Sequence, residues 1–299
     1  MKAELLGSWA ACESLLGHYA QAEEHLRAEL ALRQRFQSAK QLEIARCLGQ
    51  LGSSLQDRGK FTEAEKLFRQ ALGIRQNQLE SEHPDVAQSL KNLAALLQEE
   101  GKYSEAESLA RSSLEIRERR LGKENLIVAQ SLNNVGSILS MQGKYAPAET
   151  MLRQALAIRQ KLLGNDHPDV ALSLNNLGVL LQDQGKYQEA ESLLRQALKM
   201  QQVLLGNEHP AVASSLNNLA SVLQDLGKRR ESETLYRQVV SLQQKVLGAE
   251  HPDLAVSFSN LAMFCWTKES TARPRNVHAK RSRCSGNFWG MLILIWLPV

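Results

Sequence analysis

A glycine recurs every 42 residues along most of this 299-residue chain, and that regular spacing constrains the fold more than any other feature. A basic residue follows each glycine, an aromatic residue usually comes next, and a small residue stands three positions after the aromatic. Equal spacings without an insertion indicate one structural unit stacked six times, with part of a seventh. The glycines are Gly17, Gly59, Gly101, Gly143, Gly185 and Gly227.

The fifth unit shows why each unit should contain two helices. Pro168 is typical of a first helical position, and Asp169 places a negative charge near the helix start. Leucines at helical spacing follow, until Gly185 favours a left-handed backbone that ends the helix. The pattern predicts a first helix of about 16 residues, roughly 24 Å long, and a second helix that begins at Tyr187.

The recurring Gly-Lys-Tyr with its two small residues resembles the tetratricopeptide repeat. The motifs Leu-Gly-x-x-His-Pro-x-Val-Ala and Ser-Leu-Asn-Asn-Leu-Ala resemble the longer repeats of the kinesin light chain cargo domain and of nephrocystin-3. This resemblance implies an all-α, right-handed superhelical solenoid of six helix pairs and one extra helix over residues 1–266. It also implies a non-catalytic scaffold or adaptor that binds a protein or peptide ligand.

Composition excludes several other classes of protein. The formal charge is +4, but residues 267–299 hold six basic residues and one acidic residue, so the body is close to neutral. A body without a concentrated basic face is unsuited to nucleic acid. The four cysteines are widely spaced, which excludes a disulfide scaffold and the usual zinc spacings and fits the cytoplasm. We therefore expect no nucleic acid, no metal and no cofactor.

The candidate binding residues are polar positions that repeat without a packing reason. Stacked helix pairs form a superhelix whose concave wall is lined by the first helix of each pair. Asparagine is a poor helix-interior residue, yet its amide can donate and accept hydrogen bonds at once, which suits the main chain of an extended peptide. The resemblance also implies peptide contact at the Asn176 position. The predicted groove residues are Asn92, Asn133, Asn134, Asn175, Asn176, Asn217, Asn218 and Asn260, with Ser137, Val179, Ser221, Gln182, Asp183, Gln224 and Asp225 one or two turns away.

An alternative role for the asparagines is structural, because each amide could bond to the neighbouring helix and hold the superhelical angle. The two roles are compatible. Four acidic residues share another groove-side position and could either favour a ligand with a basic element or form a solvated face; they are Asp57, Glu99, Asp183 and Asp225.

Two further patterns have structural interpretations. The recurring histidines lie one per unit, about 8–10 Å or more apart, so they are better helix caps than ligands of one metal ion. They are His83, His167, His209 and His251. A glutamate precedes an arginine by four residues in every unit, as in Glu149 and Arg153. This spacing predicts helix-surface ion pairs rather than an anion-binding ladder.

The tail, residues 267–299, has a different composition from the repeats. Basic residues precede an uncharged run from Phe288 to the end, which is too short to span a bilayer alone. The tail could dock on an anionic membrane surface, or it could be a disordered extension. A third possibility is that the array is the sensor segment of a larger signalling ATPase.

Overall fold

The computed structural model describes residues 2–35, 41–247, 254 and 256–262. Throughout this part of the chain the only regular secondary structure is helical, as predicted, and residues 256–262 are helical as well. The helices are α1 (Lys2–Leu15), α2 (Tyr19–Arg35), α3 (Gln41–Asp57), α4 (Phe61–Gln78), α5 (Pro84–Glu99), α6 (Tyr103–Leu121), α7 (Leu126–Met141), α8 (Tyr145–Leu163), α9 (Pro168–Asp183), α10 (Tyr187–Leu205), α11 (Pro210–Asp225) and α12 (Arg229–Leu247).

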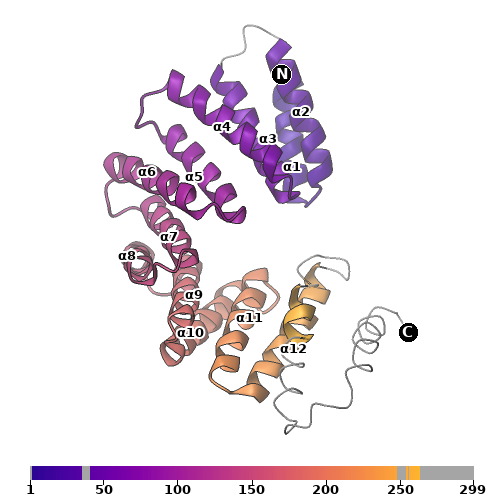
Figure 1. The fold of residues 1–299 in the computed structure, drawn as a ribbon. Helices are drawn as coiled ribbons and strands as arrows, with labels where there is room; N and C mark the ends of the chain where they lie inside the picture. Colours follow the sequence, from indigo (N-terminus) through magenta and orange to yellow (C-terminus); the bar gives the residue numbers. More distant parts are fainter. Residues whose placement is uncertain (1, 36–40, 248–253, 255, 263–299) are drawn as a thin grey trace, which may run out of the picture.

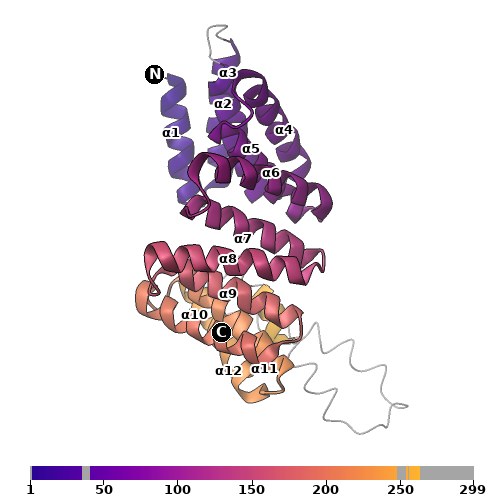
Figure 2. The ribbon, with the colours of Figure 1, turned by 90° about the vertical axis from the view of Figure 1, so that its left-hand side faces the viewer.

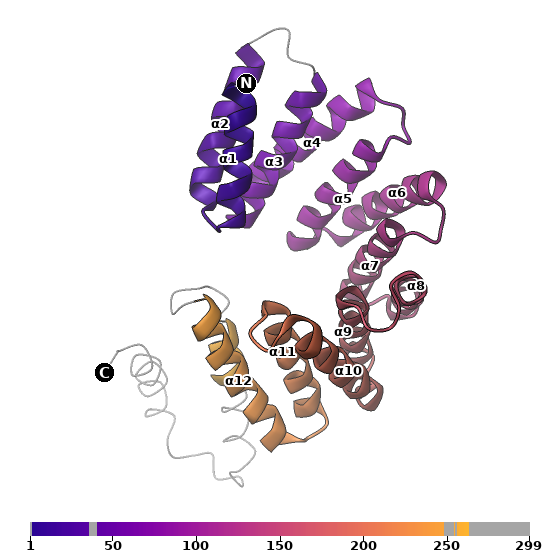
Figure 3. The same cartoon turned by 180° about the vertical axis from the view of Figure 1, so that it is seen from behind.

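The helices stack pairwise into a curved solenoid. Seen from opposite sides, α5, α7, α9 and α11 lie on the inner side of an arc, with α6, α8 and α10 outside them (Figures 1 and 3). Successive odd-numbered helices from α3 to α11 touch one another. Turned by 90°, the arc shows helices that change direction along the stack, upright at α1–α3 and nearly level at α7–α9 (Figure 2). The odd-numbered helices therefore form one continuous concave wall.

The three odd-numbered helices that follow a His-Pro pair, α5, α9 and α11, start where the sequence predicts, and their caps explain why. In α9, Pro168 is the first helical residue, and Nδ1 of His167 accepts a hydrogen bond from the Asp169 backbone N–H at 3.1 Å. His83 and His209 cap α5 and α11 in the same way. The predicted role of these three histidines as caps is confirmed, while His251 lies outside the described residues.

The predicted helix ends are also correct. Gly185 has φ +75°, a left-handed conformation that costs glycine little. This turn lets the Lys186 backbone N–H donate to the Leu181 carbonyl at 2.8 Å, which satisfies a group that a helix end leaves free. Tyr187 then begins α10.

Small residues let the two helices of a pair approach closely. A Cβ placed on Gly178 would lie 2.7 Å from Cγ of Leu194 and 3.4 Å from the carbonyl oxygen of Ala190. Ala190 and Leu194 are both fully buried. The same contact recurs one repeat earlier, where Gly136 meets Leu152. The close packing of α9 against α10 thus depends on a glycine, with no Cβ, at position 178.

The predicted glutamate–arginine pairs are present, and in the first five repeats the carboxylate has a second cationic partner that was not predicted from the sequence. Glu149 accepts from Arg153 at 2.7 Å within α8 and from Lys186 of the following repeat at 3.2 Å. Gln184 also donates to Glu149, at 2.9 Å. The lysine that follows the repeat glycine therefore ties its repeat to the one before it, as Lys102, Lys144 and Lys228 do with Glu65, Glu107 and Glu191.

This ladder makes stability depend on pH in acid. Hydrogen bonds from Gln184, Arg153 and Lys186 lower the pKa of Glu149 to about 2, below its ordinary value of 4.5. A carboxylate with a lowered pKa stabilises the fold above its ordinary value and loses that effect as the pH falls toward the folded-state value. We expect urea-denaturation midpoints to fall between pH 4.5 and 2. The Glu149→Gln variant should have a lower urea midpoint than the wild type at pH 6, and its midpoint should fall less on acidification. An equal fall in the midpoints of both proteins would contradict the role given to Glu149.

The residues after 262, including Cys265 and the whole tail 267–299, lie outside the described part of the chain. The two alternatives for the tail, docking on a membrane surface and a disordered extension, therefore stay predictions, as does the boundary at residue 266. Of the helices that are described, none combines the length and the apolar character that crossing a bilayer demands.

Candidate functional site

The predicted groove residues lie on the odd-numbered helices α5, α7, α9 and α11 and on the helical residues 256–262. This places them on the concave wall. Most of the asparagines are half-buried, whereas Asn175 is only 8% exposed. The wall is therefore a polar surface built into the packing rather than a row of freely exposed side chains.

The asparagines bond to one another across neighbouring repeats, and we call this row the amide ladder. Nδ2 of Asn176 donates to Oδ1 of Asn133 at 2.8 Å, which links α9 to α7. Asn218 donates to Asn175 at 3.2 Å, and Asn260 donates to Asn217 at 3.0 Å. The structural role foreseen for these amides is thus present in three rungs. Each second asparagine uses one of its donors here, so it retains capacity for a ligand.

A second row of polar contacts runs parallel to the amide ladder, nearer the carboxyl ends of the odd-numbered helices. Gln182 donates to Oγ of Ser221 at 2.8 Å and to a carboxylate oxygen of Asp225 at 2.6 Å. Gln98 donates to Oγ of Ser137 at 3.2 Å. Ser140 donates to Asp183 at 3.2 Å. Of the predicted acidic residues, Glu99, Asp183 and Asp225 therefore take part in ties between repeats. Gln224 is half-buried on the same face.

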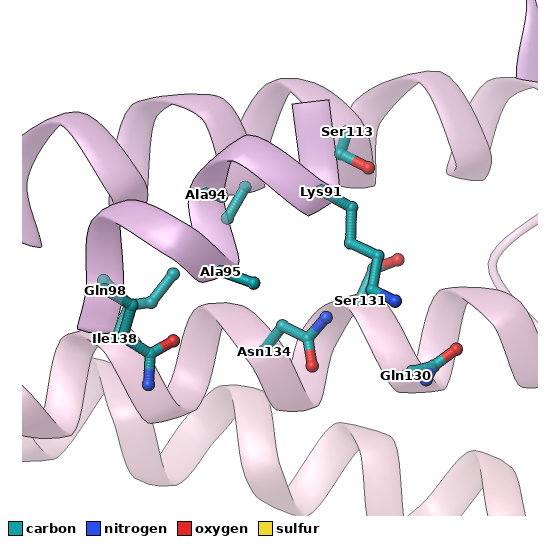
Figure 4. A pocket seen from close by; sticks show the side chains of 10 residues that line it. Lys91, Ala94, Ala95, Gln98, Ser113, Gln130, Ser131, Asn134 and Ile138 are labelled. Carbon is teal, nitrogen blue, oxygen red and sulfur yellow. The ribbon is translucent and has the colours of Figure 1, made fainter. Parts of the chain in front are cut away.

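The amide ladder stops at the junction of α5 and α7, because Lys91 occupies the position of an asparagine. Among the described residues, the Asn134 side chain makes no hydrogen bond. Its amide points into a hollow of about 170 Å³, with Lys91 reaching in from α5 and Gln130 and Ser131 alongside on α7 (Figure 4). Asn134 is therefore the groove asparagine whose amide is open to a partner.

Completing the amide ladder should stabilise the array. Lys91→Asn would place an acceptor opposite Asn134, as Asn133 stands opposite Asn176, and would remove an ammonium group whose pKa burial lowers. We expect the free energy of unfolding to rise by roughly 0.5–1.5 kcal/mol, the contribution of one intramolecular hydrogen bond. The reverse change, Asn133→Lys, should lower it in the same urea titration. An unchanged or lower value for Lys91→Asn would contradict the role given to the ladder.

The sequence analysis missed three arginines that reach the wall from the even-numbered helices. Arg117 on α6 donates to Oγ of Ser131 at 2.8 Å and to Oε1 of Gln88 at 3.0 Å. Arg75 and Arg159 make the equivalent bonds to serines of the next helix. The sequence did carry a signal for these residues, because Arg75, Arg117 and Arg159 are 42 residues apart and so place one cation in each of three successive repeats.

These arginines give part of the wall a positive character. Arg117 and Arg159 are 7% and 5% exposed, and neither forms a salt bridge among the described residues. Burial lowers the pKa of both guanidinium groups. Burial, and then the charge of Arg117, also lower the pKa of Lys91. The acidic residues predicted for the wall, such as Asp183 and Asp225, therefore make only one side of the groove negative. The cations Lys91 and Arg117 lie at the other side, around α5, α6 and α7.

The groove offers hydrogen-bond donors and acceptors but no assembled catalytic or metal-binding group. Within the described ranges, no three histidine, cysteine, aspartate or glutamate side chains stand close enough to hold one metal ion. Cys47 is buried, and burial with the hydrogen bond to Glu29 raises its pKa to about 12, which opposes nucleophilic reactivity. What the wall can do chemically is to bind the main chain and side chains of another molecule.

Comparison with known proteins agrees with this architecture. The tetratricopeptide-repeat family profile matches residues 2–77, 43–119, 85–161, 127–202, 169–243 and 211–272. No curated protein sequence matches. A solved structure of a putative kinesin light chain with nearly identical TPR-like repeats, from Podosopora anserina, is similar at 30% identity and a TM-score of 0.57, covering 70% of this chain and 99% of that one.

Two more distant structures share the fold. BtubC (BKLC) from P. vanneervenii is 23% identical with a TM-score of 0.59, covering 84% of this chain and 94% of its own. A Rap protein complexed with Competence and Sporulation Factor is 16% identical with a TM-score of 0.57, covering 91% of this chain and 76% of its own.

Proposed function

The chain belongs to the tetratricopeptide-repeat family, and on this premise we propose that it is a non-catalytic scaffold that binds an extended protein segment along its concave wall. The observation that carries the proposal is the row of half-buried side-chain amides on successive odd-numbered helices. Within the described part of the chain the Asn134 side chain makes no hydrogen bond, and Asn176 and Asn218 use one donor each. Such amides can pair with both the N–H and the C=O groups of an extended main chain.

The repeat geometry supports an extended ligand. Equivalent positions on α7, α9 and α11 recur at the spacing of packed helices, about 8–10 Å, whereas an extended chain advances roughly 3.3 Å per residue. One asparagine therefore stands opposite about every third residue of such a segment. A folded, globular partner would instead have to match the curvature of the whole wall.

The charges on the wall support a ligand with polar ends of opposite sign. Lys91 and Arg117 lie beside the hollow that Asn134 faces, and they would favour a carboxylate there. Asp183 and Asp225 stand further along, at the other end of the odd-numbered helices, and would favour a basic group. The structure of a Rap protein in complex with Competence and Sporulation Factor supports the idea that an array of this fold can hold a second molecule.

The experiment is a selection of random-sequence peptides on the whole chain, followed by affinity measurement on the variant Asn134→Ala/Asn176→Ala/Asn218→Ala. We expect selected peptides to bind the wild-type protein and to lose about tenfold or more of their affinity for the variant, which is the loss expected from removing central contacts. Arg153→Ala, on the outer helix α8, is the matched control and should bind as the wild type does. Equal binding by the folded triple variant would refute the role of the asparagines.

A further inference from the structure

One junction of the concave wall departs from the repeat at three positions at once. At the junctions of α3 with α5, of α5 with α7 and of α9 with α11, the second row carries a glutamine, an acidic residue and, on the next helix, a small side chain. Between α9 and α11 these are Gln182, Asp183 and Ser221. The junction of α7 and α9 instead has Ser140, Met141 and Val179.

These three changes leave one polar tie where the next junction has two, and they expose apolar atoms. Gln182 donates to Ser221 at 2.8 Å and to Asp225 at 2.6 Å, whereas Ser140 donates to Asp183 at 3.2 Å and makes no bond to Val179. Met141 stands where the two flanking repeats hold the carboxylates of Glu99 and Asp183, and it is 55% exposed. Val179 replaces a serine hydroxyl and is half-buried.

The result is a hollow of about 320 Å³ between α7 and α9. Met141 and Val179 form its apolar sides, and the fully buried Leu152 and Leu180 contribute to its floor. Amides surround these apolar groups, because Asn176, Asn175 and Asn218 also line the hollow. Ser137, Ser140 and Asp183 complete the lining, so the hollow combines apolar surface with hydrogen-bonding groups, as binding pockets usually do.

From this combination we propose that the hollow between α7 and α9 receives one large apolar side chain of the extended segment, and so selects partners by that residue. The inference rests on the proposed function, because the same segment has its main chain held by Asn176 and Asn218. Met141 suits such a role, since the unbranched thioether side chain adapts its shape to what it contacts. When a ligand covers exposed apolar atoms, their removal from water makes the free energy of binding more favourable.

The geometry also defines the neighbours of the apolar residue. Successive side chains of an extended chain point to opposite sides, so the residues before and after the anchor point away from the hollow. At the two flanking junctions the positions of Met141 and Val179 hold a carboxylate and a serine, as Asp183 and Ser221 do between α9 and α11, whereas in this hollow Ser137 and Asp183 stand beside the two apolar side chains. The partner class is therefore an extended segment with a single large apolar residue flanked by polar residues.

The test compares the wild-type chain with Ser140→Gln/Met141→Asp/Val179→Ser, which gives this junction the residues of its neighbours and therefore should fold. Peptides selected from a random-sequence library on the wild-type chain should share one Leu, Met, Phe or Trp. Changing that peptide residue to Ala should weaken binding to the wild type about tenfold or more, but binding to the variant less than about twofold. Ser53→Val, at the position of Val179 in the second repeat, is the control and should match the wild type.

A second readout does not depend on any variant. With the methionine methyl groups labelled with carbon-13, the selected peptide should shift the Met141 signal and leave that of Met151 on α8 in place. Peptides that bind without a shared apolar residue, an equal alanine effect in the folded variant, or an unmoved Met141 signal would each overturn the inference while leaving the proposed function intact. A library that yields no binding peptide would overturn both.

Discussion

Gly178→Val should lower the free energy of unfolding by about 1–3 kcal/mol, the usual cost of overpacking a core. The first atom of any side chain at this position would lie 2.7 Å from Cγ of Leu194, and the carbonyl oxygen of Ala190 stands 3.4 Å away. Because Leu194 is fully buried, its side chain has nowhere to move without shifting α10. Urea denaturation followed by circular dichroism measures the change.

Two comparisons separate this clash from the ordinary cost of valine in a helix. Gly73→Val, in α4, meets no atom within 4 Å and should change stability by only a few tenths of a kcal/mol. In a Leu194→Ala background, Gly178→Val should be tolerated, because the space left by the leucine receives the new methyl groups. A full additive loss in that background would show that the two helices do not meet through this glycine.

Asn134→Ala should weaken the binding of a selected peptide about tenfold or more while leaving the stability of the free protein unchanged. The amide faces the hollow between α5 and α7 and makes no hydrogen bond among the described residues (Figure 4). Asn176→Ala should weaken binding and also lower stability, because it removes the donor that Asn133 accepts at 2.8 Å. Calorimetric titration and urea denaturation of both variants give the two quantities.

This pair of variants distinguishes ligand contact from the structural role of the amides. If the asparagines act only in the ladder, Asn134→Ala will bind as the wild type does, and Asn176→Ala will lose affinity only in proportion to its loss of folded protein. If they contact the ligand, the loss for Asn134→Ala will appear without any change in the unfolding midpoint. The control Arg153→Ala should alter neither quantity by more than a surface ion pair contributes, about 0.3–0.5 kcal/mol.

Much of the fold follows from local signals in the sequence. Pro168 with His167 marks a helix start, and Gly185 marks a helix end, because each acts through the backbone of its own neighbours. The position of the asparagines on the concave wall also follows, since the period places them on one face of each first helix. Contacts inside one repeat, such as Glu149 with Arg153, are predictable for the same reason.

The contacts between repeats could not be predicted, because they depend on how far each helix pair is rotated against the next. Asn176 bonds to Asn133 rather than to Asn134, and this choice is set by the superhelical offset. The same offset brings Lys186 to Glu149 and Arg117 to Ser131. The hollow beside Met141 arises where a glutamine bond to the next helix is replaced by the shorter Ser140–Asp183 contact. Its only signal in the sequence was the irregularity of these residues.

The most direct test of the account is to map a bound peptide on the protein by nuclear magnetic resonance of the side-chain amides. If the peptide lies along the concave wall, the Asn134, Asn176 and Asn218 amide signals should shift on titration, and the largest backbone changes should follow α7, α9 and α11. Shifts confined to the outer helices α6, α8 and α10, with the three amide signals unmoved, would contradict the claim that the concave wall is the binding surface.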